Sequence, residues 1–359
     1  MPDSIIDKSI RRKGRGAGFN PPNRFSQLHL EPIEIEWGPD DEERKIQTVF
    51  LKDTSKTILA KNDSPDIPFT YSINPYRGCE HGCIYCYARP SHEYLGFSSG
   101  IDFETKIMVK MDAARLLSEA FQKKSWKPQM VCLSGNTDCY QPVERKLKIT
   151  RQCLEVFLKY RNPVGIITKN HLVTRDLDIL KQLAELNLIS VTISMTTLDE
   201  TLTRRMEPRT SIASRRLETI EALASSGIPV EVLISPVIPG LNDKELPAIL
   251  REISARGARS ASYVFLRLPG PVQQLFSEWL EREFPDRAAK ILHLVKDVHG
   301  GKLDDPRFNI RFEGKGEMAR AIDKLFRLNC RKYGLNKTGV SLSTNHFRHK
   351  ELRQEDLFV

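Results

Sequence analysis

Short apolar runs alternate with longer segments of helical periodicity over most of the chain. Runs of about four to eight apolar or β-branched residues predict buried strands, and apolar residues three and four positions apart predict helices that cover them. The predicted strands span 69–74, 130–134, 164–168, 189–195, 230–237 and 261–266. The predicted helices span 112–123, 143–160, 176–186, 212–225, 244–256 and 272–284, with Thr174 as the expected cap of the third.

This alternation assigns the chain to the α/β class, because strands that alternate with helices form βαβ units and a parallel sheet. Six such units are fewer than the eight of a closed barrel, so an open partial barrel and a doubly wound sheet both fit the pattern. In both architectures the residues that carry chemistry lie at the carboxyl ends of the strands.

The segments on either side of this α/β core differ from it. Residues 1–64 have weak periodicity and many polar residues and prolines, and the stretch 19–25 (FNPPNRF) predicts an extended arm that packs on the core. The last segment is basic and mostly helical in its pattern. We therefore expect an N-terminal arm at 1–64, a core at 65–285 and a helical C-terminal extension at 286–359.

The net charge is +9, and much of it lies near the two ends of the chain. Residues 311–350 hold ten Lys and Arg against three Asp and Glu, and the first twenty residues hold five against two. A basic C-terminal extension fits a polyanionic partner such as nucleic acid. A solvated helical surface has the same composition, so charge alone leaves both interpretations open.

No stretch of the chain predicts a membrane helix, which requires roughly 18 or more consecutive apolar residues. The N-terminus is basic but lacks the apolar segment of a secretory signal, and the acidic residues Asp3 and Asp7 do not fit a transit peptide. We therefore expect a cytoplasmic protein with no membrane partner.

Three of the seven cysteines, Cys79, Cys83 and Cys86, lie within eight residues on the loop that follows the first predicted strand. An odd number of cysteines in a long chain does not fit a disulfide framework. In a reducing compartment such a group is typical of metal binding. We expect three of the other cysteines to be packing residues: Cys132, Cys153 and Cys330.

The spacing C-x3-C-x2-C favours an iron–sulfur cluster. Three thiolates this close can hold three corners of a cubane cluster, whereas ordinary four-iron clusters use four cysteines. No fourth cysteine lies nearby in the sequence, so one iron would stay open to a ligand. Gly78 and Gly82 allow the backbone to wrap closely around the cluster.

A zinc site is the alternative. Zinc takes four ligands, and His81 or His92 could supply the fourth. Structural zinc sites pair two short knuckles, however, and the sequence has no second knuckle. The second interpretation is therefore a structural zinc-binding or electron-transfer iron–sulfur protein without radical chemistry.

With Tyr85 just before its third cysteine, the loop resembles that of the radical S-adenosylmethionine (SAM) superfamily. The resemblance covers about residues 65–285 and implies that superfamily's partial (β/α)6 barrel. Two further motifs, 74–79 (NPYRGC) and 137–142 (TDCYQP), resemble the branch that contains spore photoproduct lyase and proteins described as DNA repair photolyases.

The resemblance implies an enzyme that contains a [4Fe-4S] cluster and uses SAM. The open iron would bind SAM, and an electron from a donor such as flavodoxin or ferredoxin would split it into methionine and a 5′-deoxyadenosyl radical, which abstracts a hydrogen atom from the substrate. These motifs do not identify the substrate. The branch resemblance and the basic extension together suggest nucleic acid, as in lyase-type repair of a DNA photolesion.

The resemblance also implies which residues contact SAM. In this superfamily the loop after the second strand holds the methionine amino group, and here that loop is Ser134–Asp138. It departs from the Gly-Gly-Glu that is frequent in the superfamily. We expect Gly135 to allow close approach and Asn136, Thr137 or Asp138 to accept hydrogen bonds.

Two further contacts are expected. Tyr85 is expected near the adenine. On the fourth strand Thr192, Ser194 and Thr196 alternate, so their side chains share one face, and we expect Ser194 to contact the ribose or the carboxylate. Hydroxyls that bond only to neighbouring backbone groups are the other interpretation.

Cys139 and Tyr140 are a candidate catalytic pair, because spore photoproduct lyase uses a cysteine and a tyrosine to return a hydrogen atom. A small buried cysteine is the other interpretation of Cys139. Past the fourth strand, Glu207 and Arg209 form a charged pair that we expect to be solvated at the surface.

Overall fold

The computed structural model of the 359-residue chain describes residues 14–21, 32–33 and 47–349. Most of the predicted arm, including Phe25, lies outside the described residues, as do both ends of the chain. Within the described ranges no helix is long and apolar enough to cross a membrane.

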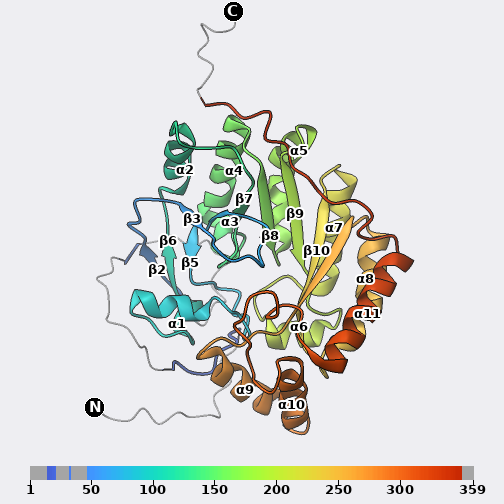
Figure 1. Ribbon diagram of the computed structural model, residues 1–359. Coiled ribbons are helices and arrows are strands. Elements are labelled where there is room, and N and C mark those ends of the chain that lie inside the picture. The colour runs from blue at the N-terminus through green and yellow to red at the C-terminus, as the bar shows by residue number, and fades with distance from the viewer. Residues whose placement is uncertain (1–13, 22–31, 34–46, 350–359) are drawn as a thin grey trace, which may run out of the picture.

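A seven-stranded sheet forms the centre of the molecule (Figure 1). Its order is β11-β10-β9-β8-β7-β4-β3, and neighbours are parallel except for β3 (Leu59–Lys61), which is antiparallel to β4. The six parallel strands follow chain order: β4 Tyr71–Ile73, β7 Val131–Leu133, β8 Val164–Thr168, β9 Ile189–Ser194, β10 Val230–Val237 and β11 Ser260–Phe265. This confirms the expected partial barrel of six βα units; the pattern does not predict β3.

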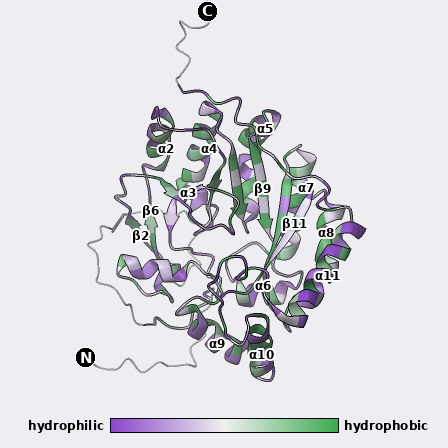
Figure 2. Cartoon of the chain, viewed as in Figure 1, coloured by the Kyte–Doolittle hydropathy of each residue, from purple (hydrophilic) through white to green (hydrophobic). Residues whose placement is uncertain are grey.

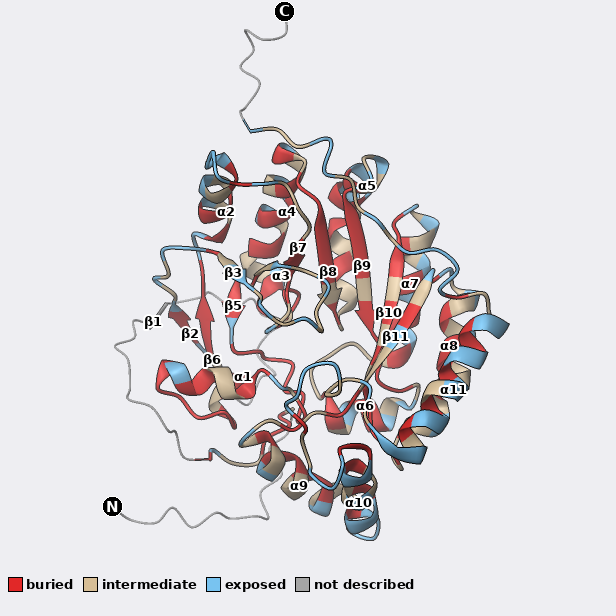
Figure 3. Cartoon of the chain, viewed as in Figure 1, coloured by how far each residue is buried: buried red, intermediate tan, exposed pale blue. Residues whose placement is uncertain are grey.

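Amphipathic helices cover the outer face of this sheet: α2 Ala113–Gln122, α4 Ile149–Tyr160, α5 Leu177–Glu185, α7 Ala213–Ser225 and α8 Leu246–Ala255. Figure 2 shows largely apolar strands beside helices with polar outer faces, and Figure 3 shows that most of these strands are buried. Phe121, Phe157 and Leu183 are fully buried between the two layers. Each such side chain contributes about 1.5–3 kcal/mol through removal of its apolar surface from water.

Two helical expectations need correction. The helix predicted over 143–160 is divided into α3 (Glu144–Leu147) and α4, because Lys148 has a left-handed conformation with φ of 52°. Thr174 does not cap a helix, since it lies inside the 3-10 turn η3 (His171–Asp176), where its hydroxyl donates to the His171 carbonyl.

Several short helical segments are not predicted by the sequence pattern, and two of them lie beyond β9. Helix α6 (Glu200–Met206) is capped by Asp199, whose carboxylate accepts the backbone N–H groups of Thr201 and Leu202. It is too short for its apolar residues to show a helical period. The other segment is the 3-10 turn η4 (Asp243–Glu245).

A second sheet, order β1-β2-β6-β5, is likewise not predicted. Its strands are β1 Pro32–Ile33, β2 Val49–Lys52, β6 Lys106–Val109 and β5 Tyr76–Arg77. Strand β5 pairs with β6, so the two ends of the chain segment between them lie side by side. This segment, called the excursion, contains η2 (Arg89–Leu95) and α1 (Asp102–Thr105). The three clustered cysteines lie on this excursion.

The segment after β11 is helical, as expected. It contains α9 (Val272–Glu283), α10 (Ala288–Val298) and α11 (Gly316–Lys332). Helix α11 packs beside α8 and β11 at one edge of the sheet (Figure 1). There the rings of Phe326 and Tyr263 lie 4.8 Å apart, and Ile322 and Cys330 join the apolar core of the barrel.

Candidate active site

The three clustered cysteines lie on one loop between β5 and η2, past the carboxyl end of β4. Cys79 and Cys83 are buried and Cys86 is partly exposed, and all three are free thiols. Gly78 and Gly82 have φ of 79° and 67°, a region in which a side chain is strained. The loop therefore stands where a βα protein carries its chemistry, and glycine is needed at both bends.

The environment of these thiols disfavours their charged form. Burial raises the pKa of all three, and the next cause is the charge of Asp138 at Cys79 and of Glu207 at Cys83. Cys86 further raises the pKa of Cys79 and Cys83, and its side chain packs against the two apolar clusters that contain these cysteines. Since the thiolate is the form that binds metal, a cationic group bound here would offset the cost of ionising them.

Glu80 anchors the cysteine loop to the segment after β7. Its backbone N–H donates to Gln141 Oε1 at 2.9 Å, and its carboxylate accepts the backbone N–H of Val143 at 2.8 Å. The guanidinium of Arg209 lies 3.2 Å from the same carboxylate. Glu80 is fully buried, so these donors compensate for its loss of water.

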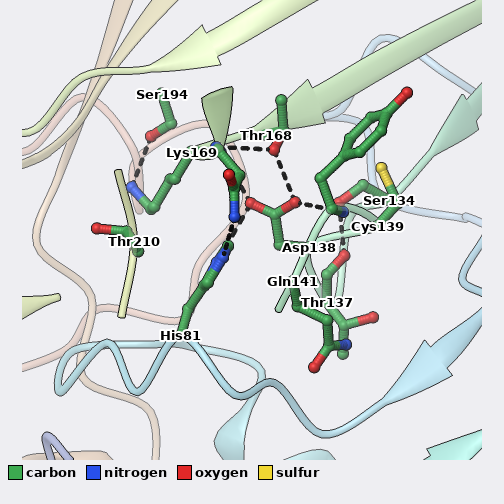
Figure 4. Close-up of polar contacts among 12 residues, drawn as sticks. His81, Ser134, Thr137, Asp138, Cys139, Gln141, Thr168, Lys169, Ser194 and Thr210 are labelled. Carbon is green, nitrogen blue, oxygen red and sulfur yellow. Dashed lines mark hydrogen bonds and ion pairs between the residues drawn. The ribbon is translucent and has the colours of Figure 1, made fainter. Parts of the chain in front are cut away.

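Asp138 joins the cysteine loop to the ends of two strands (Figure 4). One oxygen accepts the Thr168 hydroxyl at 2.7 Å and the Tyr140 N–H at 2.9 Å, and the other accepts the Lys169 N–H at 2.8 Å. His81 Nδ1 lies 3.4 Å from this carboxylate. The site thus fixes the cysteine loop relative to the ends of β7 and β8.

Lys169, directly after β8, is the centre of a polar network. Its ammonium donates to Ser194 Oγ at 2.7 Å and to the Ser235 carbonyl at 3.3 Å. It also lies 3.2 Å from the Glu207 carboxylate and 5.6 Å from the centre of the Tyr85 ring. A partly exposed cation among hydroxyls at the carboxyl edge of the sheet is suited to bind an anionic group.

The expectation that Glu207 and Arg209 form a solvated surface pair is wrong. Glu207 is 1 % exposed, and its carboxylate binds Arg216 and the hydroxyl of Thr196. Burial alone would raise its pKa, but Arg216 and Lys169 outweigh burial and hold the pKa of this carboxyl well below its ordinary value. Glu207 is therefore an ionised, buried support of the network.

The loop after β7 has the irregular backbone expected of a ligand-binding turn. Ser134 and Gly135 have φ of 109° and 118°, and the Asn74 carboxamide oxygen accepts the N–H groups of Asn136 and Thr137 at 3.1 and 3.3 Å. A Cβ on Gly135 would have no atom nearer than 3.9 Å, and Asn136 is exposed. The Gly135 carbonyl accepts the Tyr87 hydroxyl, and Thr137 is buried.

Cys139 and Tyr140 lie apart from this network. Both are fully buried in the apolar core, with the Cys139 sulfur 3.8 Å from the Leu133 carbonyl and the Tyr140 hydroxyl donating to Asp176 at 3.0 Å. Figure 4 shows the Cys139 sulfur on the side away from Lys169. Burial raises the pKa of both side chains. Their role in hydrogen transfer stays a prediction, and this packing does not favour it.

The structure brings together Tyr85, Ser194 and the three cysteines, and adds residues that sequence reasoning missed. Lys169 follows the predicted strand 164–168 directly, so its position at the end of a strand was a usable signal. Arg216, inside helix α7, had no local signal, because its partner Glu207 lies in a separate loop.

Comparison with known proteins identifies the family. The model of the Radical SAM superfamily matches residues 73–253, half of the chain. An uncharacterized protein of Mycobacterium tuberculosis is 35% identical over 232 residues, which are 64% of this chain and 68% of that protein. An uncharacterized protein of Methanocaldococcus jannaschii is 29% identical over 216 residues, 60% of this chain and 77% of that protein.

Solved structures agree on the fold. Spore photoproduct lyase complexed with dinucleoside spore photoproduct matches with a TM-score of 0.56 and 15% identity, over 80% of each chain. A cysteine-to-serine mutant of the same lyase matches with a TM-score of 0.58 over the same share. At this identity the likeness concerns the fold alone. Since the family model spans half of the chain and includes the cysteine loop and the ends of β7, β8 and β9, this protein belongs to the radical SAM superfamily, whose enzymes use SAM and an iron–sulfur cluster.

Proposed function

We propose that this enzyme holds a [4Fe-4S] cluster at Cys79, Cys83 and Cys86 and takes a hydrogen atom from its substrate. When bound, the cluster supplies the electron that splits SAM into methionine and a 5′-deoxyadenosyl radical. The observation that carries the proposal is the proximity of three clustered free thiols to the Lys169 network at one edge of a partial barrel.

The donor set fits a cubane cluster better than zinc. Each thiol would bind a different iron, so the three sulfurs need not converge on one point. A zinc ion needs four convergent ligands, and among the described residues no three His, Cys, Asp or Glu side chains are arranged to hold a single ion. His81 and His92 are also engaged elsewhere, at Asp138 and at the Lys106 carbonyl.

The polar network supports a binding site for SAM. We assign the methionine carboxylate to the Lys169 ammonium, because a charge-assisted pair is the strongest contact that the site offers. Gly135 and the exposed Asn136 would receive the methionine amino group, with the Thr137 main chain completing the loop. Ser194 would contact the ribose or carboxylate, and the buried Tyr85 ring would lie near the adenine.

The test is anaerobic reconstitution with iron and sulfide, followed by reduction with SAM present. We expect about four irons per chain, a matching electron paramagnetic resonance signal and formation of 5′-deoxyadenosine. Replacement of Cys79, Cys83 or Cys86 by Ala should abolish all three results. The matched control is Cys153→Ala, which removes a fully buried thiol on α4 and should leave iron content unchanged.

Stoichiometric zinc without iron in the purified protein, or full iron content in the Cys83→Ala variant, would contradict the proposal. The reaction also needs a reductant. We propose a small donor of the flavodoxin or ferredoxin type, which can be checked by replacing the chemical reductant with each of these proteins.

A nucleic-acid substrate, transformed in a lyase-like reaction, is the substrate class that we favour. One supporting observation is the exposed face of α11, where basic residues follow one another at helical spacing: Arg320, Lys324, Arg327 and Arg331. A second is Tyr87, which follows the third cysteine and is 52% exposed. Exposed aromatic rings offer stacking surfaces for bases, and basic helices follow the phosphate backbone.

A further inference from the structure

We propose that residues 14–21 form a cover over the cysteine loop and that Glu104, which holds this cover in place, is a positioning residue for the iron–sulfur cluster. The inference rests on the proposed function, because it takes Cys83 as a cluster ligand. Residues 14–21 are the first described part of the predicted arm, and the segment lies about 65 positions before the loop that it covers.

The cover is held by the carboxylate of Glu104. This carboxylate accepts the backbone N–H of Ala17 at 2.9 Å and that of Gly16 at 3.2 Å. Arg15 in turn donates to the Glu104 carbonyl at 2.7 Å. Further along, Asn20 exchanges two hydrogen bonds with Asp102, both of 3.0 Å. A segment without helix or strand pairing is thus fixed by specific contacts.

The same carboxylate also supports the cysteine loop, through Arg89. Glu104 pairs with Arg89 at 2.6 Å, and both side chains are fully buried. The Arg89 guanidinium donates twice to the carbonyl of Cys83, at 2.8 and 3.0 Å. Glu104 therefore links the cover to the backbone of the second cysteine through one buried ion pair.

The cover touches the loop closely at Gly16. A Cβ on Gly16 would lie 2.0 Å from the Gly82 carbonyl oxygen and 3.2 Å from the Ile84 nitrogen. Both atoms belong to backbone, so neither can move aside cheaply. Ala17 is 1% exposed and packs in the apolar cluster that contains Cys83 and Tyr85. Only glycine at position 16 allows this contact.

The physical consequence is exclusion of solvent. The backbone on either side of Cys83 would face water if the segment were displaced, because Gly16 and Ala17 lie directly against it. Water and dioxygen reach a cluster through such openings, and burial of the loop also sets the dielectric around the sulfurs. The cover is expected to close this route.

The test compares Gly16→Ala with Gly18→Ala in the full chain. Neither glycine has a positive φ, so alanine adds no backbone strain at either position. A Cβ on Gly18 meets only side-chain atoms, the Arg282 guanidinium at 3.2 Å and the Glu278 carboxylate at 3.4 Å, which makes this variant the matched control. In cluster-free protein, labelling of Cys83 by a charged thiol reagent, followed by mass spectrometry, should be about ten-fold faster in Gly16→Ala and unchanged in Gly18→Ala.

In cluster-loaded protein, the brown absorbance should fade faster in air in Gly16→Ala than in wild type, with iron content before exposure to air unchanged. Glu104→Gln, which weakens the hold on both the cover and Arg89, should fade faster as well. Equal labelling and fading in all variants would overturn the proposal. Failure of Gly16→Ala to take up iron without air would overturn it as well, because the segment would then be part of the ligand scaffold and not a cover.

Cys153 labelling serves as the internal reference for unfolding. If Cys153 is labelled as fast as Cys83 in Gly16→Ala, the variant is unfolded and hydrogen exchange of the wild-type protein tests the proposal instead. The backbone amides of Gly16 and Ala17 should be protected from exchange. Exchange of these amides at the rate of an unstructured peptide would overturn the proposal. The thiol-labelling experiment needs no cluster, so it still tests the cover if the proposed function fails.

Discussion

At the scale of single residues, the site depends on a few buried or partly buried charges whose partners come from distant segments. Lys169 is the most informative, because it is the cation that the network leaves partly exposed, with 16% of its side chain accessible. Glu207 and Arg216, by contrast, are almost fully buried and hold each other. Lys169 therefore has the geometry of a ligand contact, and the other two have the geometry of supports.

Replacement of Lys169 by Met should weaken SAM binding to the iron-loaded protein by roughly 10- to 100-fold, because the methionine carboxylate loses a charged partner. Calorimetric titration with SAM measures the change, and iron content should stay at the wild-type value. Lys181→Met, on the exposed face of α5, is the matched control and should bind as wild type does. Unchanged affinity in Lys169→Met would contradict the assignment of the carboxylate.

His92 should make the protein sensitive to mild acid. Burial lowers its pKa from 6.5 to about 4, although the Lys106 carbonyl that its ring bonds opposes this shift. Above pH 6.5 the ring is neutral in both states and the shift has no effect. As the pH falls from 6.5 toward 4, the unfolded chain takes up a proton that the folded protein refuses, so the fold loses stability.

Between pH 7 and pH 5 the free energy of unfolding should fall by an amount that includes about 2 kcal/mol from His92. Urea unfolding at both pH values measures it, and His92→Gln should show a correspondingly smaller fall. His293→Gln, at an exposed position on α10, should follow the wild-type curve. The same fall in His92→Gln as in wild type would show that another group is responsible.

At the scale of the elements, α11 has two faces with different tasks. Its inner face contributes Ala319, Ile322 and Phe326 to the core of the barrel. Its outer face carries Lys324 and Arg331, in the stripe described above. Helical periodicity alone separates apolar packing from a basic surface, and that surface is the part of α11 open to a polyanion.

Charge reversal at two positions of this stripe, Lys324→Glu with Arg331→Glu, should weaken the binding of an oligonucleotide and reduce the slope of log Kd against log salt by about 2, since each lost phosphate contact removes about one unit. Fluorescence anisotropy over a range of salt concentrations measures both. The charge-matched control reverses Lys290 and Lys296 on the exposed face of α10. An equal effect in the control would point to net charge and not to the stripe.

At the scale of the whole molecule, the described part of the arm and the C-terminal extension both pack against the core. Helix α11 shares the apolar core of the strands, and Arg311 binds Asp66, 245 positions earlier in the sequence, with Nε 2.5 Å from the carboxylate. Residues 14–21 lie on the cysteine loop. The boundaries at 64/65 and 285/286 therefore mark changes in the sequence pattern, and we expect that the three segments do not fold independently.

The full chain should unfold in a single transition, in which far-UV circular dichroism and tryptophan fluorescence coincide. Phe326→Ala, in the extension, should lower the free energy of unfolding by about 3–5 kcal/mol and shift both signals together. Leu328→Ala, which removes a side chain that is 55% exposed, should change it by less than about 0.5 kcal/mol. Two separate transitions in Phe326→Ala would indicate that the extension folds by itself.

Much of the fold was determined by local sequence. Strands β8 and β10 have the bounds that their apolar runs predict, because a buried strand needs a continuous apolar segment and this requirement is local. The spacing of Cys79, Cys83 and Cys86 is likewise local, so the loop and its resemblance to the radical SAM superfamily could be predicted. The break at Lys148 could not, since it depends on a single left-handed residue inside a continuous helical pattern.

The surroundings of the cysteines were decided only by the tertiary structure. Lys169, Glu207 and Arg216 meet because the fold brings the end of β8 to the segment between α6 and α7, and no local pattern reports such a meeting. Burial has the same origin, because the sequence predicts a solvated Glu207 and only the fold shows that it is buried. Sequence spacing therefore predicted the cysteine loop as the place of a cluster, and long-range packing decided which charges surround that loop.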